Sequence, residues 1–568
     1  MSGTLTDADP DGATARDDGE SSADQLAAAN LRPRAGAAAA RPTLRDRLVP
    51  AMPGDGRWGW GGPLLVTAFA AVLRFWNLGQ PRVFSFDETY YAKDALSLLR
   101  FHYEQSTVTD ANQVLLSGNT AVFTGKASFI VHPPVGKWLI ALGEWVFGVT
   151  PFGWRFVPAV LGTLAVLMLC RIVRRMTRST LLGCLAGLLL AVDGLSIVLS
   201  RTALLDGPLA FFVLAAFGAL VVDRDRARTR LADWAESRGP VPVPDSESGP
   251  RLGLRPWRLL AGLLLGLACA TKWSGLWFLI AFGLMSVLWD LGARRAVGVR
   301  WPLVAALARD SWTGFLSLAP VAFVVYGLSW TPWLLSYHRM KLDGWSINPT
   351  LHDPPWYVPH FLVGPFSHLP ESVRALVDYH RQILYFHTHL SDPHPYAAKA
   401  TGWLLQVRPT AFWSLNDIKQ GTDGCTAATC VREVTSIGTP LLWWAATAAL
   451  FWCLWRWVGA RDWRAGAALG AVLAGWIPWV VLYRDRTIFT FYEVAFAPFM
   501  VIGLVLALGH LLGPSDTVSP TRRTWAAAVT GGYVLLVVAN TAWLWPLLVG
   551  DTLPYADWLR RLWFRGWI

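Results

Sequence analysis

Long apolar blocks, separated by polar loops, restrict the fold of this chain more than any other feature. A helix needs about 20 mostly apolar residues to cross the hydrocarbon core of a bilayer. Only 16% of the 568 residues are charged, whereas soluble chains usually carry about a quarter. We therefore predict an all-α polytopic membrane protein with about 11 transmembrane helices, and exclude disordered, collagen-like and ordinary cytosolic proteins. The blocks lie at 61–78, 156–171, 180–199, 204–222, 257–273, 274–290, 312–334, 438–457, 465–483, 494–512 and 525–548.

Arginine between the blocks predicts the orientation of the chain. Short cytoplasmic loops are enriched in positive charge. The N-terminus is therefore placed on the cytoplasmic side of the plasma membrane, and the C-terminus on the outer side. All seven Lys then fall in outer loops or, for Lys272, at the outer end of a span. Arg560, Arg561 and Arg565 in the predicted outer tail fit less well. The Arg-rich loops are 171–178, 224–230, 294–300, 456–464 and 522–523.

The polar segments divide the chain into regions. Residues 1–56 are rich in Ala, Asp, Ser, Gly and Pro and predict a disordered cytoplasmic tail. Because the net charge of +11 is explained by the loops, we predict contact with membrane lipid and no nucleic-acid partner. The other predicted regions are a transmembrane catalytic domain at 57–548, its outer loops at 79–155 and 335–437, its cytoplasmic linker at 223–256, and an extracytoplasmic tail at 549–568.

Cysteine is scarce, with six residues in the chain. This number is too small for a disulfide framework. Cys425 and Cys430 lie in a polar loop and could pair if that loop is outside the cytoplasm.

Asp87 and Glu88 are adjacent acids in the first long loop, shortly after the first apolar block. A carboxylate at the membrane surface could act as a general base on a hydroxyl that attacks a lipid-linked donor. Acids also stabilise the first turn of a helix, and Asp87 or Ser85 could simply cap one. On residue type alone the helix start is the commoner arrangement.

The same loop ends on His132, Pro133 and Pro134, followed by an apolar helical pattern. His132 could bind substrate or cap that helix, for which Pro134 is a suitable first residue.

Charged residues also mark the outer ends of later blocks. Arg201 and Asp206 could form a structural ion pair, or Arg201 could bind a phosphate with its planar fork. Lys272 is a second phosphate candidate, with a snorkelling interfacial lysine as the alternative.

The second long loop carries further titratable side chains, among them His394 and Arg408. His387, His389, Asp392 and His394 are enough ligands for a metal ion, but their spacing matches no standard zinc signature. A divalent metal is therefore not favoured, and no cofactor is predicted to be required.

Taken together, six segments resemble the protein O-mannosyltransferases, an integral-membrane family that glycosylates Ser and Thr of exported proteins. They run in family order over about residues 60–510. The segments are FSFDETYYAK (84–93), HPPVGKWLIALGEWVFG (132–148), GWRFVPAVLGTL (153–164), SRTALLDGPLAFF (200–212), ATKWSGLWF (270–278) and DPHPYAAKATGWLLQVRPTAFW (392–413).

This resemblance implies a GT-C-type fold and inverting transfer of mannose from polyprenyl-phosphate mannose to Ser or Thr of secreted or membrane proteins, including proteins met during export. By motif position Asp87 is the expected base, and Glu88 is expected to position the acceptor or sugar. His132 and Pro133 fall on the family's HPP motif, and Arg155 on its essential arginine. Further binding roles are expected for Arg201, Asp206, Lys272, His394 and Arg408.

Other functions are compatible with parts of the pattern. A related lipid-donor glycosyltransferase acting on a glycolipid or cell-wall polymer would share the outer acids and cations. A transporter or flippase would instead place charges along a central path.

The second loop is too short for the carbohydrate-binding-like module of eukaryotic relatives, and the Arg-rich composition resembles that of actinobacterial enzymes.

Overall fold

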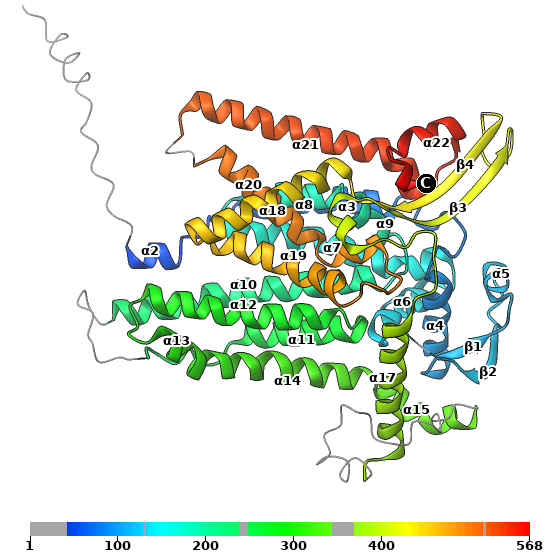
Figure 1. The fold of residues 1–568 in the computed structure, drawn as a ribbon, viewed down its shortest axis with the longest axis horizontal. Coiled ribbons are helices and arrows are strands. Elements are labelled where there is room, and N and C mark those ends of the chain that lie inside the picture. The colour runs from blue at the N-terminus through cyan, green and yellow to red at the C-terminus, as the bar shows by residue number, and fades with distance from the viewer. Residues whose placement is uncertain (1–42, 130, 238–247, 344–367, 515–517) are drawn as a thin grey trace, which may run out of the picture.

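Long helices, roughly aligned, form the body of the molecule (Figure 1). The computed structural model describes residues 43–129, 131–237, 248–343, 368–514 and 518–568. A helix or helix pair falls on every predicted apolar block, since helices satisfy their backbone polar groups without water. These helices are α3 (Arg57–Phe75), α7 (Pro151–Thr177), α8 (Thr180–Ala191), α9 (Gly194–Ser200), α10 (Asp206–Glu236), α11 (Pro256–Thr271), α12 (Gly275–Ala296), α14 (Trp312–Ser329), α15 (Thr331–Leu342), α18 (Pro440–Ala460), α19 (Trp463–Val481), α20 (Ala497–Leu512) and α21 (Pro520–Val549).

By length and apolar composition, seven spans in the described part of the chain could cross a membrane. The count is eight if α8 and α9, bent by 65° at their junction, are one span. Helices α11 and α20 are apolar but shorter. The helical structure of the blocks is thus confirmed, whereas the number of about 11 membrane spans stays a prediction.

The two long loops are folded, and they add short strands to the predicted, predominantly helical fold. Two small antiparallel sheets form beside the helices, of two strands and three strands. They lie at one end of the molecule, which we call the loop end (Figure 1). Its elements are α4 (Glu88–Phe101), β1 (Gln105–Thr107), α5 (Ala111–Leu116), β2 (Phe123–Ala127), α6 (Val135–Phe147), α17 (Glu371–His389), η3 (Ala400–Leu405), β3 (Thr410–Lys419), β4 (Thr429–Ser436), η4 (Thr490–Ala495), β5 (Leu553–Pro554), α22 (Tyr555–Arg561) and η5 (Arg565–Trp567).

The C-terminal tail is part of the loop end. Strand β5 pairs with β4, through Val431 and Leu553. The indole of Trp558 donates a hydrogen bond to Glu433, 3.1 Å away. Near the tip of the β3–β4 hairpin, Cys425 and Cys430 form a disulfide. The pairing that the sequence left open is therefore present.

At the opposite end, which we call the far end, two segments outside the predicted apolar blocks are helical. Thr43 and Asp46 form a capping box for the short helix α2 (Leu44–Leu48), although the sequence predicts disorder to residue 56. Helix α10 continues to Glu236, well into the predicted linker. Residues 1–42 of the predicted tail and 238–247 of the predicted linker lie outside the described residues. Helix α13 (Pro302–Ala305) and the π-helical turn η1 (Ala306–Ser311) lead into α14 at this end.

Small residues allow helices α11 and α14 to pack closely. A Cβ added at Gly262 would lie 2.2 Å from the carbonyl oxygen of Ser317, and one at Gly266 would lie 2.9 Å from Ala322. Close backbone approach of this kind replaces the hydrophobic driving force that is missing between helices in lipid.

Candidate active site

Asp87 lies at the start of α4, at the loop end. The preceding Phe86 has a left-handed backbone, with φ of 51°. Its backbone N–H donates to the carbonyl of Phe412 in β3, 2.9 Å away. The hydroxyl of Tyr91, one turn into α4, lies 3.4 Å from the Asp87 carboxylate. These contacts fix the loop that carries Asp87 and leave its carboxylate lightly bonded.

Burial controls the protonation of Asp87. It raises the pKa of this carboxyl to about 6, with Lys272 opposing the shift and Asp206 adding to it. A carboxylate with a pKa just below neutrality is ionised at pH 7 and still accepts a proton readily. Asp87 therefore has the protonation behaviour of a general base.

Glu88 has a different environment, since it is fully buried. Both carboxylate oxygens accept hydrogen bonds of 2.8 Å from Arg155. The backbone N–H groups of Ser85 and Ala203 donate to it as well, at 2.8 and 2.9 Å. Glu88 thus holds the Asp87 loop to the neighbouring helices, and the expectation that it positions the acceptor or sugar stays a prediction.

Arg155 is a partner of the loop backbone rather than of a phosphate. Besides Glu88, its guanidinium donates to the carbonyls of Leu78, Pro81 and Val83 at 2.9–3.3 Å. All of its nitrogens are used in this way. The structure therefore gives Arg155 a role in holding the loop, and substrate binding by this residue stays a prediction.

Arg201 is also structural, and it does not pair with Asp206. It donates to carbonyls at the end of α3, including those of Arg74 at 3.0 Å and Trp76 at 2.6 Å. The last carbonyls of a helix lack partners within it, and a cation there is favoured by the helix dipole. In the structure Arg201 therefore contacts backbone carbonyls, and its predicted binding role stays a prediction.

Asp206 and Lys272 form a buried ion pair next to Asp87. The Lys272 ammonium lies 2.8 and 3.0 Å from the two Asp206 oxygens. It also lies 4.1 Å from the ring centre of Tyr492 in η4. Because Asp206 opens α10 and Lys272 ends α11, the pair joins two helices at the site.

A cavity of about 920 Å³ begins at Lys272 and is lined largely by helices of the body. Its walls are mostly apolar, with aromatic residues such as Trp277 and Phe323. Several polar side chains lie on its boundary, namely His132, Lys272, His380, His387, Tyr483 and Arg486. An apolar chamber with cations on its boundary suits a lipid with an anionic headgroup.

Arg486 is a site residue that the sequence reasoning missed. Its guanidinium donates to Nδ1 of His387, 3.1 Å away, and stacks near Trp479 and Tyr483. It forms no ion pair with a carboxylate in the described part of the chain, and its Nε has no hydrogen-bond partner there. The available signal was an arginine near the start of the short segment between the apolar blocks 465–483 and 494–512, which is predicted to lie outside.

His132 and His387 stack on each other, with ring centres 4.9 Å apart. His387 also hydrogen-bonds the carbonyl of Val131 at 2.9 Å, which assigns the proton to Nε2 and leaves Nδ1 to accept from Arg486. Burial lowers the pKa of His387 to about 4 and that of His132 well below its usual value. Both rings are neutral at pH 7, and Nδ1 of His132 lacks a partner among the described residues. A substrate hydroxyl could donate to it if that nitrogen is unprotonated.

The other predicted residues lie farther from this cavity. His394 packs its ring against Phe86 and Phe489 and so neighbours the Asp87 loop. Arg408 donates to the carbonyls of Pro395, Gly566 and Ile568 and so anchors the C-terminal tail; its predicted binding role stays a prediction. Pro133 is buried directly after His132.

The histidines of the second loop do not converge. His387 faces the cavity, whereas His389 is exposed and stacks on Tyr385. Within the described ranges, no three His, Cys, Asp or Glu side chains are arranged to hold a metal ion.

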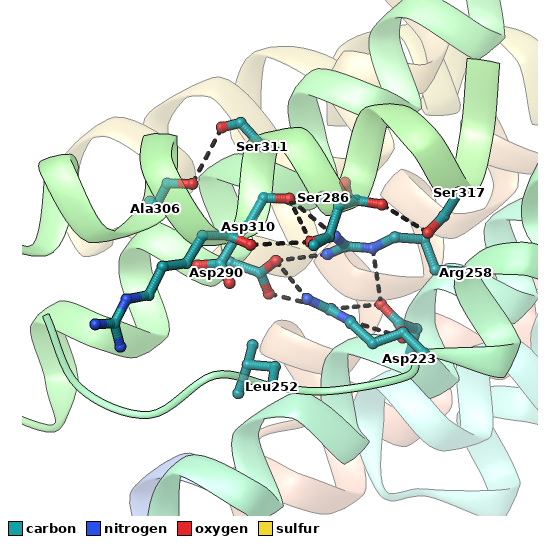
Figure 2. Close-up of polar contacts among 12 residues, drawn as sticks. Asp223, Leu252, Arg258, Ser286, Asp290, Ala306, Asp310, Ser311 and Ser317 are labelled. Atoms are coloured by element: carbon teal, nitrogen blue, oxygen red, sulfur yellow. Dashed lines mark hydrogen bonds and ion pairs between the residues drawn. The ribbon is translucent and has the colours of Figure 1, made fainter. Parts of the chain in front are cut away.

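A second buried charge cluster lies at the far end (Figure 2). Asp290 accepts from Arg255 at 2.6 Å and from Arg258 at 2.5 Å. Asp223 accepts from Arg255 at 3.0 Å. Arg294 pairs with Asp310 of η1 at 2.6 and 2.9 Å. We call these residues the far-end network; they join α10, α11, α12 and η1.

Comparison with known proteins agrees with this geometry. Residues 64–238 match the family described as dolichyl-phosphate-mannose-protein mannosyltransferase, and residues 372–567 match the C-terminal four-transmembrane region of protein O-mannosyltransferase. Polyprenol-phosphate-mannose–protein mannosyltransferases of Mycolicibacterium smegmatis and Corynebacterium glutamicum are 38% and 34% identical to it, over 91% and 89% of this chain and 94% and 92% of theirs.

A solved structure shows the same fold. It is the S. cerevisiae protein O-mannosyltransferase Pmt1–Pmt2 complex bound to the sugar donor, which matches 93% of this chain and 94% of its own with a TM-score of 0.62. Because the sequence identity is only 15%, this match shows the fold and nothing about function. The fold is the GT-C membrane fold that the motifs implied. With the family matches over both halves of the chain, the conclusion is that this protein belongs to the protein O-mannosyltransferase family.

Proposed function

We propose that the protein transfers mannose from polyprenyl-phosphate mannose to Ser or Thr hydroxyls of exported proteins, with inversion at the sugar carbon. The observation that carries this proposal is the position of Asp87. Its lightly bonded carboxylate neighbours the Lys272–Asp206 pair, and Lys272 in turn lines an apolar cavity. The names of the relatives supply the sugar and the class of acceptor.

The cavity would hold the donor by its two unlike parts. Its apolar walls suit the first isoprene units of the lipid, and Arg486 and Lys272 would bind the phosphate. Arg486 is the better candidate because Asp206 already neutralises Lys272. A planar guanidinium also presents paired N–H groups to phosphate oxygens.

The reaction balances with the residues at hand. The acceptor oxygen attacks C1 of mannose on the face opposite the phosphate, and Asp87 takes the hydroxyl proton. The C1–O bond to phosphate breaks, and its electron pair leaves on the lipid phosphate. That group needs stabilisation of its developing charge rather than a proton, which Arg486 and Lys272 would supply. No metal or other cofactor enters a step.

Tyr91 and the Lys272–Asp206 pair would act as positioning groups. The Tyr91 hydroxyl orients one oxygen of Asp87. Asp206 holds the Lys272 ammonium in place, so the cation is present before the donor arrives. Such preorganisation is a main source of charge stabilisation in enzymes.

The site would face the outside of the plasma membrane, with the N-terminus in the cytoplasm and the C-terminus outside. The Arg-rich loops and the Cys425–Cys430 disulfide support this orientation, because disulfides persist in oxidising compartments. The acceptors would then be secreted or membrane proteins, met during or after export.

Transfer can be tested in membranes that contain the full chain. Radiolabelled polyprenyl-phosphate mannose is supplied with a Ser/Thr/Pro/Ala-rich peptide, and in a parallel arm with membrane glycolipid. We expect label in the peptide. Label only in the glycolipid would favour the related glycosyltransferase, and movement of the donor across vesicles without any transfer would favour the flippase.

A further inference from the structure

A group of arginines at the far end has fewer carboxylate partners than charges. Asp225 is shared by Arg175 at 3.1 Å, Arg178 at 3.0 Å and Arg224 at 3.4 Å. Arg228 lies one turn after Arg224 on α10 and forms no ion pair with any carboxylate of the described residues. Positive charge is therefore left over in this group.

Arg224 is held rigidly in place although it is poorly paired. It is only 5% exposed. Its guanidinium lies 3.4 Å from the ring centre of Trp463 and 5.9 Å from that of Trp289. Its Nε has no hydrogen-bond partner in the described chain, and the same holds for Nε of Arg228. A buried cation in this state is costly unless an anion joins it.

The neighbours of Arg224 add to the positive charge. Arg178, Arg228 and Arg464 act on it electrostatically, against the single carboxylate of Asp225. The second carboxylate of the region, Asp462, is already held by Arg464 at 2.7 Å. Within the part of the chain that the structure describes, this region cannot neutralise itself, in contrast to the nearby far-end network.

We infer that Arg224 and Arg228, with Arg178 beside them, bind a phosphate group, and that its source is an anionic phospholipid. Guanidinium groups suit phosphate oxygens, and basic pockets between membrane helices bind anionic headgroups. The end of α18 nearby exposes Trp455, Trp457 and Val458, where lipid chains would lie. This site is separate from the donor cavity and does not rest on the proposed reaction.

The test uses the full chain, purified in detergent and stripped of lipid. Dioleoyl-phosphatidylglycerol, dioleoyl-phosphatidylcholine or inorganic phosphate is added, and the midpoint of thermal unfolding is followed. Retained lipids are counted by native mass spectrometry. We expect phosphatidylglycerol to raise the midpoint and to be retained, and phosphatidylcholine to do neither.

Two variants and a control locate the effect. Arg228→Gln should weaken phosphatidylglycerol binding roughly tenfold, the usual worth of one charge-assisted hydrogen bond. The double variant Arg224→Gln, Arg228→Gln should lose the retained lipid. Arg226→Gln is the matched control, because Arg226 is exposed on the same helix and stacks on Trp257 instead.

Each outcome decides the inference. If inorganic phosphate raises the midpoint of thermal unfolding as much as phosphatidylglycerol does, the anion site is supported but its ligand is a soluble anion rather than a lipid. If phosphatidylglycerol has no more effect than phosphatidylcholine, or if Arg228→Gln and Arg226→Gln bind it equally, the site is disproved. The first of these comparisons uses only the unmodified chain, so it stands even where a variant fails to fold.

Discussion

The far-end network and the candidate active site both bury charged side chains, but they satisfy them differently. In the far-end network, Asp290 and Asp310 each receive two or more short bonds from arginine. At the loop end, Asp87 has one long contact to Tyr91, and Arg486 has a neutral histidine as its partner. The first arrangement is closed, and the second leaves charge for a ligand.

This difference shows why burial alone is a poor guide to function. Arg155, Arg201 and Arg258 are as buried as any site residue, yet all three are used by carbonyls or carboxylates of the protein. A buried group with unused bonding capacity is the better indicator of a functional site.

The largest effect is expected at Asp87. Asp87→Asn keeps the size of the side chain but cannot accept the proton, so turnover in the membrane assay should fall about 10²- to 10⁴-fold, the usual contribution of a general base. Asp110→Asn, an exposed position in the same loop, should transfer normally. Near-normal turnover of the Asp87 variant would remove the contrast between the far-end network and the candidate active site.

The far-end network should respond in stability instead. Asp290→Asn leaves Arg255 and Arg258 without their shared carboxylate, at a cost of about 3–5 kcal/mol in the free energy of unfolding. The thermal midpoint and the yield of folded protein report this loss. Asp233→Asn breaks an exposed pair with Arg45 and should cost less than about 1 kcal/mol. A stable Asp290 variant with impaired donor binding would contradict a structural role.

A smaller effect is expected at the proposed phosphate site. Arg486→Gln should raise the KM for the lipid donor or lower turnover by about 10- to 100-fold, as for loss of a charge-assisted hydrogen bond. Arg484→Gln, two residues earlier and exposed, is the control. Equal kinetics of the two variants would place the phosphate elsewhere.

The smallest effect is a pH dependence. With its pKa raised to about 6, Asp87 is ionised above that pH and protonated below it. Because the base must be ionised, transfer should fall about tenfold from pH 7 to pH 5, in the ratio of the ionised fractions. Initial rates across this range, with recovery checked on return to pH 7, measure it. A flat profile would contradict the assigned base.

Much of the architecture was predictable because it depends on local periodicity. Every apolar block is helical, since chain length and composition decide whether a helix can lie in lipid. The strands of the loop end were not predicted, because β3 and β4 depend on pairing across the hairpin, and β5 joins β4 from more than 100 residues away. The loop lengths alone carried no signal for either sheet.

The site was predicted in part. Asp87, His132 and Lys272 were identified from motifs; His132 and Lys272 line the cavity, and Asp87 neighbours Lys272. Arg201 and Arg408 were identified by the same reasoning and bind backbone carbonyls instead. Arg486 lay outside every motif considered, and only the fold brings it to His387.

The sequence by itself determined the helical body, the family and the acidic residue at the centre of the proposed reaction. Those properties follow from the composition of the chain and from short motifs. Tertiary structure decided which cations can bind a ligand. Arg155 and Arg201 donate their hydrogen bonds to carbonyls and carboxylates that are distant in the sequence, whereas Arg486 has only a neutral histidine as its hydrogen-bond partner in the described chain. The availability of a charge depends on all of its neighbours in space, and sequence spacing does not encode them.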